Sequence, residues 1–328
     1  MATTTMTLAA EAPDLDVLAY IHGPVFGFAH HRGITHSFIG MPFVAAAVVG
    51  VVYLLYRLAR WRGRSFPKAP RWGLLLVYAW LAGLSHILLD YTTNYGVRPF
   101  TPFYGKWYSW DVVFIIEPVL LLVLVAGLTL PALFRLINEE VGERQSGPRG
   151  RLGAGLALLG MLAVWGVRDF EHRRAVATLQ SRLYQGAEPI RVSAYPYWID
   201  PFKWAGVVET RDFFVNMNVN SLTPDVDPDN RAQIRYKPEE TPVTIAAKKS
   251  YLGRVYLNWA TYPFTETERL DAPRVGYIVR FADLRFLYPD RKSKPLSAAV
   301  LLDDQLNVIA ERMGTRTQPA NGGGAHAK

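Results

Sequence analysis

Four apolar stretches in the first half of the chain predict helices that cross a membrane. A hydrocarbon core of roughly 30 Å needs about 20 mostly apolar residues in a helix. The stretches that approach this length are residues 38–56, 72–91, 112–133 and 152–167. The last of them is shorter and rich in glycine. Buried helices of a soluble domain are the alternative, but four such runs in one half of the chain favour a membrane.

Basic residues between the apolar stretches predict the orientation of the chain. The connection 57–71 is rich in Lys and Arg and contains no acid, and the connection 135–151 carries several Arg diluted by glutamates. The loop between the second and third stretches holds only Arg98 and Lys106. Because cytoplasmic loops carry the excess of Lys and Arg, the two basic connections are expected in the cytoplasm. The start of the chain, the 94–110 loop and everything after the fourth stretch are then expected outside.

The pattern changes after residue 167 and predicts a second domain. Residues 168–185 are charged but keep a helical pattern, so the fourth span is expected to continue beyond the membrane. Alternating apolar residues with turn signals follow and predict strands. The segments with this alternation are residues 191–197, 205–219, 276–287 and 298–310. A helix is expected within residues 242–259.

The expected fold is therefore mainly α: a polytopic transmembrane bundle of about four spans, followed by a small α+β or β-rich extracytoplasmic domain. The bundle is assigned to residues 1–167 and the soluble domain to residues 168–314. Residues 315–328 contain a glycine run and are expected to be a disordered tail.

Charge and cysteine content narrow the function. The net charge of +8 would fit nucleic-acid binding, but many of the Lys and Arg residues flank apolar spans, where topology and anionic lipid explain them. Membrane lipid is thus an expected partner and nucleic acid is not. The chain contains no cysteine, which excludes disulfides and thiolate metal sites. Any metal must be bound by nitrogen and oxygen ligands.

Three short clusters carry the candidate chemistry. Asp14 and Asp16 precede the first span, and a His-rich segment from His30 to His36 leads into it. The third cluster holds His86 and Asp90 near the end of the second span. Their i, i+4 spacing places both side chains on one helix face. Ionisable groups within a span normally mark function. For this pair taken by itself, a structural His–Asp hydrogen bond that joins helices is an equally good interpretation.

The predicted orientation brings these clusters to the same membrane face. The His-rich segment enters the first span from outside, and the second span runs outward to its His/Asp pair. Imidazole and carboxylate ligands without thiolate suit zinc, with Mn or Fe as other choices. The expected metal ligands are His31, His36, His86, Asp90 and Asp16. His30 cannot be ranked against its neighbour by sequence alone.

Several neighbouring polar residues have both a functional and a structural interpretation. Arg32 is a candidate for steadying anionic charge or for a salt bridge. Ser37 and Ser85 each lie beside a histidine, where capping or a supporting hydrogen bond is favoured over a nucleophilic role. Asp111 is expected to cap the third span, and Glu117 is a candidate buried partner. His22 and His172 are expected to be incidental.

These motifs, taken in order, resemble a bacterial inner-membrane family described as predicted metal-dependent hydrolases, some of them LexA-regulated. The resemblance covers about residues 8–135 strongly. It rests on residues 12–18, 31–37, 85–92, 96–102 and 107–111. Members of that family usually begin with a further apolar helix carrying a Thr-His motif. This chain goes from Met1 almost directly to Asp14, so a shortened start, with one ligand and one span fewer, is expected.

The resemblance and the clusters together predict a metal-dependent hydrolase at the outer face of the cytoplasmic membrane, acting on a lipid, a phosphoester or another envelope molecule. Asp14 or Asp16 would complete the metal shell or act as a general base, and Arg32 would steady developing negative charge. A non-enzymatic scaffold or sensor with a structural His/Asp cluster is the alternative. A transporter is a weaker one, because few charged groups lie near the predicted bilayer centre.

Overall fold

The chain folds into two compact units, each built from segments that are distant in sequence. The computed structural model describes residues 1–140, 151–223, 225–271, 275–291 and 294–319, and within 132–140 only the side chain of Leu133. The first unit comprises Met1–Ser109, Lys237–Leu287 and Lys292–Lys328. The second comprises Trp110–Tyr236 and Tyr288–Arg291. The predicted division into residues 1–167 within the membrane and residues 168–314 outside it concerns the membrane and stays a prediction.

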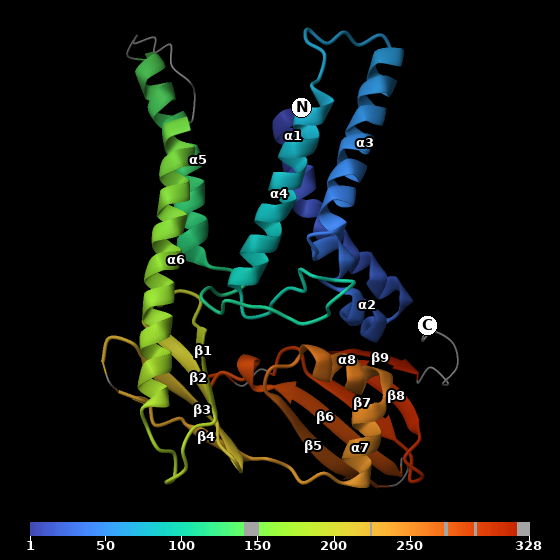
Figure 1. Cartoon of the computed structure of the whole chain (residues 1–328), viewed down its shortest axis with the longest axis vertical. Coiled ribbons are helices and arrows are strands. Elements are labelled where there is room, and N and C mark those ends of the chain that lie inside the picture. The colour runs from blue at the N-terminus through green and yellow to red at the C-terminus, as the bar shows by residue number, and fades with distance from the viewer. Residues whose placement is uncertain (141–150, 224, 272–274, 292–293, 320–328) are drawn as a thin grey trace. The chain divides into compact units, whose positions relative to one another are not determined.

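The N-terminal part of the first unit is helical. Its elements are α1 (Ala2–Glu11), η1 (Ala12–His22), α2 (Pro24–His30), η2 (Ile34–His36), α3 (Gly40–Trp61) and α4 (Trp72–Thr92). The long helices α3 and α4 run side by side, and α1 packs against both (Figure 1). Small side chains allow this close packing, since Ala9, Ala45 and Ala79 are all buried where the three helices meet.

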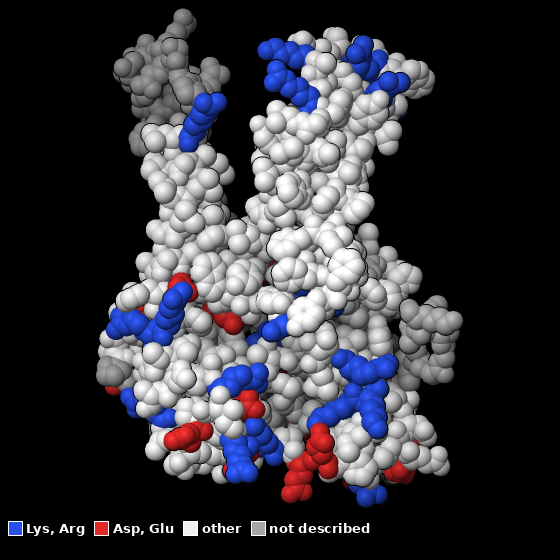
Figure 2. Space-filling view, in the orientation of Figure 1, with Lys and Arg blue, Asp and Glu red and all other residues white. Residues whose placement is uncertain are grey.

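Helices α3 and α4 are long and apolar enough to cross a membrane. Most of their large apolar side chains are exposed in the isolated chain, as expected for helices that face lipid. Lys and Arg side chains gather at the end of this hairpin where the two helices are connected, and the helices beyond it are covered by uncharged side chains (Figure 2). The arrangement matches the apolar span and basic loop that the sequence predicts.

The C-terminal part of the first unit is an antiparallel sheet with two helices on one face (Figure 1). Its strands, in spatial order, are β5 (Pro263–Leu270), β6 (Gly276–Asp283), β7 (Ala298–Leu302), β8 (Val308–Met313) and β9 (Arg316–Pro319). Helices α7 (Pro242–Lys249) and α8 (Tyr251–Trp259) confirm the expected helical segment, and a short η3 (Leu284–Phe286) follows β6. Tyr256 and Trp259 of α8 pack on Phe281 and Val279 of β6.

The second unit joins two helices to a smaller sheet. Helix α5 (Pro118–Glu140) packs along α6 (Arg151–Gln180), and α6 continues past residue 167 as predicted. The end of α6 buries Ala175 and Leu179 against the sheet. That sheet is antiparallel in the order β1 (Arg191–Pro196), β2 (Lys203–Glu209), β3 (Phe213–Asn220) and β4 (Gln233–Tyr236).

The described residues contain three candidate spans, not the four expected. They are α3, α4 and α6, whereas the third predicted stretch is the shorter apolar helix Pro118–Pro131. Helix α5 begins only at Pro118, because residues 112–117 form an irregular segment ahead of it. The expected N-cap role of Asp111 is therefore wrong. The expected partner role of Glu117 is confirmed, since both of its carboxylate oxygens accept hydrogen bonds from Arg168 Nη2 at 2.8 Å.

The predicted segments 205–219 and 298–310 hold most of β2 and β3, and β7 with part of β8. The strand predictions need two corrections. Strands β4 and β5 were not predicted, because their alternation is weak: in β5 the charged Glu266, Glu268 and Arg269 are exposed. Residues Arg316–Pro319 form β9 within the segment expected to be disordered. The rest of that tail, residues 320–328, lies outside the described residues.

Candidate metal centre

Helix α4 supplies two donors from one face near its C-terminal end. His86 and Asp90 are one helical turn apart, and His86 Nε2 lies 3.5 Å from Asp90 Oδ2. Both side chains are largely buried, with exposures of 16% and 14%. Asp90 Oδ2 is buried and has no hydrogen-bond partner among the described residues. A buried carboxylate oxygen without a partner is costly and points to a group that completes it.

The third donor comes from the short η2 element ahead of α3. His36 is fully buried, and its Nε2 lies 3.3 Å from His86 Nε2 and 3.5 Å from Asp90 Oδ2. The turn is held by Ser37, whose Oγ donates to Ile34 O and accepts from Gly40 N. These bonds agree with the supporting hydrogen bond that was favoured for this serine, whereas the N-cap of α3 is Ile39. Gly40 is needed there, because a Cβ at this position would collide with the Ile34 carbonyl oxygen.

The fourth donor comes from η1, which winds past the two histidines. Asp14 Oδ1 lies 3.3 Å from His36 Nε2 and 3.5 Å from His86 Nε2. The four donor atoms of Asp14, His36, His86 and Asp90 all lie within 4.8 Å of one another. Asp14 differs from the other three because half of its side chain, 51%, is exposed. The group therefore opens to solvent on the Asp14 side.

The spacing of these four atoms fits a small divalent cation. A tetrahedral ion with bonds of about 2.0–2.1 Å separates its ligand atoms by roughly 3.3–3.4 Å. Five of the six separations within the group are 3.3–3.5 Å, and the sixth, between Asp14 and Asp90, is at most 4.8 Å. Two imidazole nitrogens and two carboxylate oxygens are a donor set that Zn²⁺ accepts, and Mn²⁺ or Fe²⁺ also bind such ligands. The unpartnered oxygen of Asp90 and this spacing together support a metal site.

Asp16 and His31 lie behind His36 rather than in the four-atom group. Asp16 Oδ2 is 3.2 Å from His36 Nδ1, and Asp16 Oδ1 is 2.9 Å from His31 Nδ1. Thr35 Oγ1 donates to Asp16 Oδ2 at 3.3 Å and lies 3.1 Å from His36 Nδ1. A carboxylate on the far nitrogen of a ligating imidazole fixes its tautomer and ring orientation. Asp16 and His31, both expected as ligands, would in this geometry position His36 for a metal, Asp16 directly and His31 through Asp16.

Arg32 is also a positioning residue in this structure. Its Nη2 donates to Asp90 Oδ1 at 2.7 Å, and its Nη1 donates to Gly96 O at 2.9 Å. The guanidinium lies over the ring of Tyr95, 4.7 Å from its centroid. Because both terminal nitrogens are engaged, Arg32 directs the other oxygen of Asp90 toward the histidines. Each of these nitrogens carries a second N–H, and the buried Nε has no hydrogen-bond partner among the described residues, so the expected role in stabilising charge on a substrate stays a prediction.

Ionisation within the site is set by its own hydrogen bonds. Contacts from His36 and His86 hold the pKa of Asp14 well below its usual range. Burial would raise the pKa of Asp16, but hydrogen bonds from His31 and His36 lower it overall. Burial opposes protonation of His36, but Asp14 and Asp16 outweigh this and raise its pKa above 6.5. Without a metal, the group thus favours ionised carboxylates and a protonated His36.

The structure also shows which residues the sequence interpretation missed. Thr35 and Tyr95 contact the site through His36 and Arg32. Arg98 Nη2 donates to Ala29 O at 2.8 Å and His31 O at 3.0 Å, which holds the loop before η2. Arg98 was noted only as one of two basic residues in its loop, and no spacing rule connects it with residues so distant in sequence.

The remaining sequence candidates lie outside the group. His30 Nδ1 bonds Phe26 O at 2.9 Å. Ser85 Oγ donates to Ala82 O within its own helix at 2.7 Å. His22 is exposed and contacts the ring of Phe26. These contacts agree with the structural roles favoured for the serine and for His22.

Two protein-family models match the chain. The YdjM inner membrane protein model matches residues 1–175, which include all four donors. The YfhP C-terminal alpha/beta plait domain model matches residues 242–321. The uncharacterized protein YfhP of Bacillus subtilis (strain 168) is 23% identical over 312 residues, covering 94% of this chain and 84% of that protein. No solved structure matches the chain.

Proposed function

Because the chain belongs to the YdjM inner membrane protein family, we propose that it is a membrane-bound, metal-dependent hydrolase whose cation is held by His36, His86 and Asp90. The observation that carries this proposal is the set of donor atoms 3.3–3.5 Å apart around the unpartnered oxygen of Asp90. Three protein ligands with one open side are the pattern of catalytic zinc sites. The family resemblance implies hydrolysis.

Asp14 occupies the open side and has the properties of a general base. Its side chain is half exposed, whereas the other three donors are buried. The low pKa of Asp14 keeps it ionised, so it can orient a water; when His36 and His86 ligate a cation they no longer donate to Asp14, which removes the main cause of the low pKa and lets the carboxylate accept a proton. In the absence of substrate the same oxygen is close enough to serve as a fourth ligand. Asp16 and Arg32 hold His36 and Asp90 in place from behind.

A divalent cation bound here would lower the pKa of a water molecule and polarise a carbonyl or phosphoryl oxygen of the substrate. The substrate class follows from the position of the ligands. His86 and Asp90 lie at the end of a candidate membrane-spanning helix, and the segment that carries Asp14 exposes apolar side chains of its own, among them Leu15, Leu18 and Ile21. We propose a lipid or an envelope phosphoester as substrate, at the outer face of the cytoplasmic membrane.

The test is hydrolysis by the purified full chain in detergent. Phospholipids and chromogenic phosphoesters and carboxylic esters would be incubated with wild-type protein, with protein treated with a chelator, and with chelated protein resupplied with Zn²⁺ or Mn²⁺. Turnover that is lost with the chelator, regained with the ion and absent in His86→Ala would support the proposal. Turnover that survives in a folded His86→Ala variant would refute it. Bound metal without turnover across the panel would favour the scaffold or sensor interpretation.

A further inference from the structure

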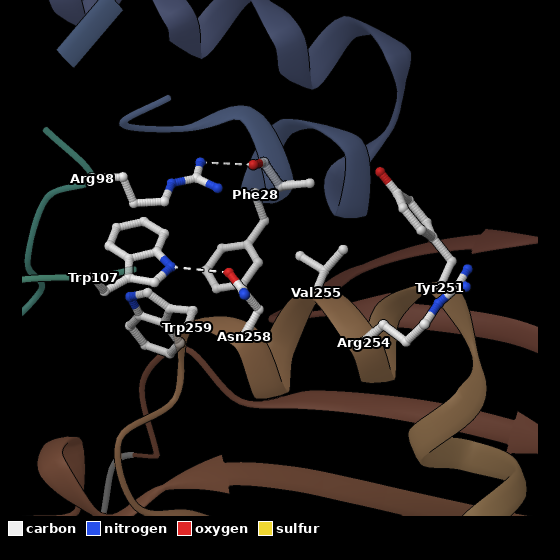
Figure 3. A pocket seen from close by; sticks show the side chains of 9 residues that line it. Phe28, Arg98, Trp107, Tyr251, Arg254, Val255, Asn258 and Trp259 are labelled. Atoms are coloured by element: carbon white, nitrogen blue, oxygen red, sulfur yellow. Dashed lines mark hydrogen bonds between the residues drawn. The ribbon is translucent and has the colours of Figure 1, made fainter. Parts of the chain in front are cut away.

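A separate cavity in the first unit has the chemistry of an anion site. It has a volume of about 360 Å³ and lies between α2, the 94–109 loop and α8 (Figure 3). Its lining residues include two arginines, one amide and several aromatic rings, but no carboxylate. Arg98 and Arg254 stand toward opposite sides of the cavity in Figure 3. The metal ligands do not line it, so it is a second site rather than an extension of the first.

The two arginines carry positive charge that the described part of the protein does not neutralise. No carboxylate among the described residues lies within 4.0 Å of either guanidinium. Arg98 is partly buried; its guanidinium donates to the carbonyl oxygens of Ala29, His31 and Arg32 and lies over the ring of Trp107, 4.5 Å from its centroid, while Asp16 attracts it from beyond ion-pair distance. Burial lowers the pKa of Arg98. Neither arginine has an ion pair among the described residues, and an anion in the cavity would supply one.

The remaining lining residues supply a further donor and apolar walls. Asn258 Oδ1 accepts a hydrogen bond from Trp107 Nε1 at 3.3 Å, which leaves the Asn258 Nδ2 donor for a ligand. Trp107 and Trp259 form one wall in Figure 3, with Phe28 and Val255 beside them. The cavity therefore combines charged and neutral donors with apolar surface, the composition expected of a site for an amphipathic anion.

The place of the cavity in the chain indicates where this anion comes from. The loop that contributes Arg98 and Trp107 begins directly after α4 ends at Thr92. The same loop exposes Phe100, Phe103 and Tyr104 by 46%, 81% and 54%. Exposed aromatic side chains at the end of a spanning helix are typical of the lipid headgroup region. Guanidinium groups match the geometry of phosphate oxygens in that region.

We propose that this cavity binds the phosphate group of an anionic phospholipid, with Arg98 and Arg254 as its cationic ligands. The inference does not depend on hydrolysis at the metal site. It rests on two arginines that have no ion pair among the described residues, on a cavity lining that contains no carboxylate, and on the neighbouring end of α4. Loss of the metal through His86→Ala should leave lipid binding unchanged, and loss of lipid binding through Arg254→Gln should leave bound metal unchanged.

Native mass spectrometry of the full chain in detergent, with added phosphatidylglycerol or phosphatidylcholine, tests this proposal. Arg254 is exposed on α8 and has no side-chain hydrogen bond or ion pair among the described residues, so Arg254→Gln should fold. We expect wild-type protein to prefer phosphatidylglycerol and Arg254→Gln to bind it about tenfold more weakly. Arg211→Gln, an exposed arginine in the other unit, is the matched control and should keep the preference.

Two outcomes would overturn the proposal. Equal binding of the two lipids by wild-type protein would exclude an anionic headgroup, and an unchanged preference in both Arg254→Gln and Arg98→Gln would place lipid binding elsewhere. Glycerol 3-phosphate is added as a competitor to test whether the cavity binds a soluble phosphoester instead of a lipid. If it displaces phosphatidylglycerol at similar concentrations, and does so only with Arg254 present, the site belongs to soluble phosphoesters and the lipid source is rejected.

Discussion

Asp16 lies outside the four-donor group but contacts one of its members, His36, and can fix the orientation of that side chain. The same carboxylate contacts His36 Nδ1, His31 Nδ1 and the backbone N–H of Arg32. It therefore fixes the His36 ring and also the chain segment that leads into it. An imidazole held in this way presents its Nε2 as a metal ligand with its orientation already set.

Replacement Asp16→Asn should weaken metal binding by about 10–100-fold, the usual effect of removing a carboxylate that supports a ligating histidine. The Asn side chain keeps the shape but loses the negative charge beside His36 Nδ1. Competition with a chromophoric chelator would measure the Zn²⁺ affinity. Asp212→Asn, at an exposed position in the other unit, is the control and should bind like wild type. Equal affinity in Asp16→Asn and wild type would contradict the supporting role.

Metal binding should also weaken as the pH falls. The carboxylates of Asp14 and Asp16 raise the pKa of His36 above 6.5, so below that raised value the ring carries a proton that a cation must displace. Each displaced proton lowers the apparent affinity by about tenfold per pH unit in that range. Calorimetric titrations with Zn²⁺ in buffers of different ionisation enthalpy would report proton release. An affinity independent of pH between 6 and 8, without proton release, would count against His36 as a ligand.

The turn between η2 and α3 is the element on which the site depends most. Gly40 begins α3 directly against the Ile34 carbonyl oxygen, and the chain between them holds His36. Because the obstacle is backbone rather than a flexible side chain, a methyl group at position 40 requires the turn to move. Gly50, in the middle of the same helix, faces open space and tolerates a methyl group.

Gly40→Ala should therefore reduce metal affinity by about tenfold or more, since a displaced His36 no longer matches the other donors. Gly50→Ala is the matched control and should bind metal like wild type. Both variants would be compared by metal content and thermal unfolding in detergent. Equal metal content in the two variants would show that the turn has more freedom than the structure indicates.

The long helices and pairs of residues close in sequence could be predicted, but the path of the chain in the irregular segments between helices could not. The i, i+4 pair of His86 and Asp90 could be read from spacing, and loop charges predicted that His36 would join it. Asp14, rather than Asp16, joins His36, His86 and Asp90 in the donor group because of the 3₁₀ winding of η1, and no sequence periodicity predicts that winding. The start of α5 at Pro118 was obscured because the residues before it are also apolar.

At the scale of the whole molecule, the composition of the two units could not be predicted. The sheet of β5–β9 belongs to the same compact unit as α1–α4 although more than a hundred residues separate them. Contacts such as Trp259 Nε1 donating to Tyr95 O and Arg285 Nη1 donating to Asn94 O join them. Such pairings follow from the tertiary fold, not from local pattern.

The proposed membrane orientation can be tested without background because the chain contains no cysteine. Arg64→Cys lies in the exposed basic connection after α3, and Lys106→Cys lies in the exposed loop after α4. In cells with a permeabilised outer membrane, a membrane-impermeant maleimide should label position 106 and not position 64, because the positive-inside rule predicts a cytoplasmic basic connection. The reverse labelling would place the metal site on the cytoplasmic face.

The metal content of the purified protein tests the central claim most directly. Elemental analysis would compare wild-type protein with Asp14→Ala, His86→Ala and Asp90→Ala, after incubation with Zn²⁺ or Mn²⁺ and removal of free ion. His22→Ala is the control, because His22 is an exposed histidine outside the group. We predict about one ion per chain in wild type and control, and its loss in His86→Ala and Asp90→Ala. No bound metal in wild type, or equal metal in all folded variants, would contradict the account.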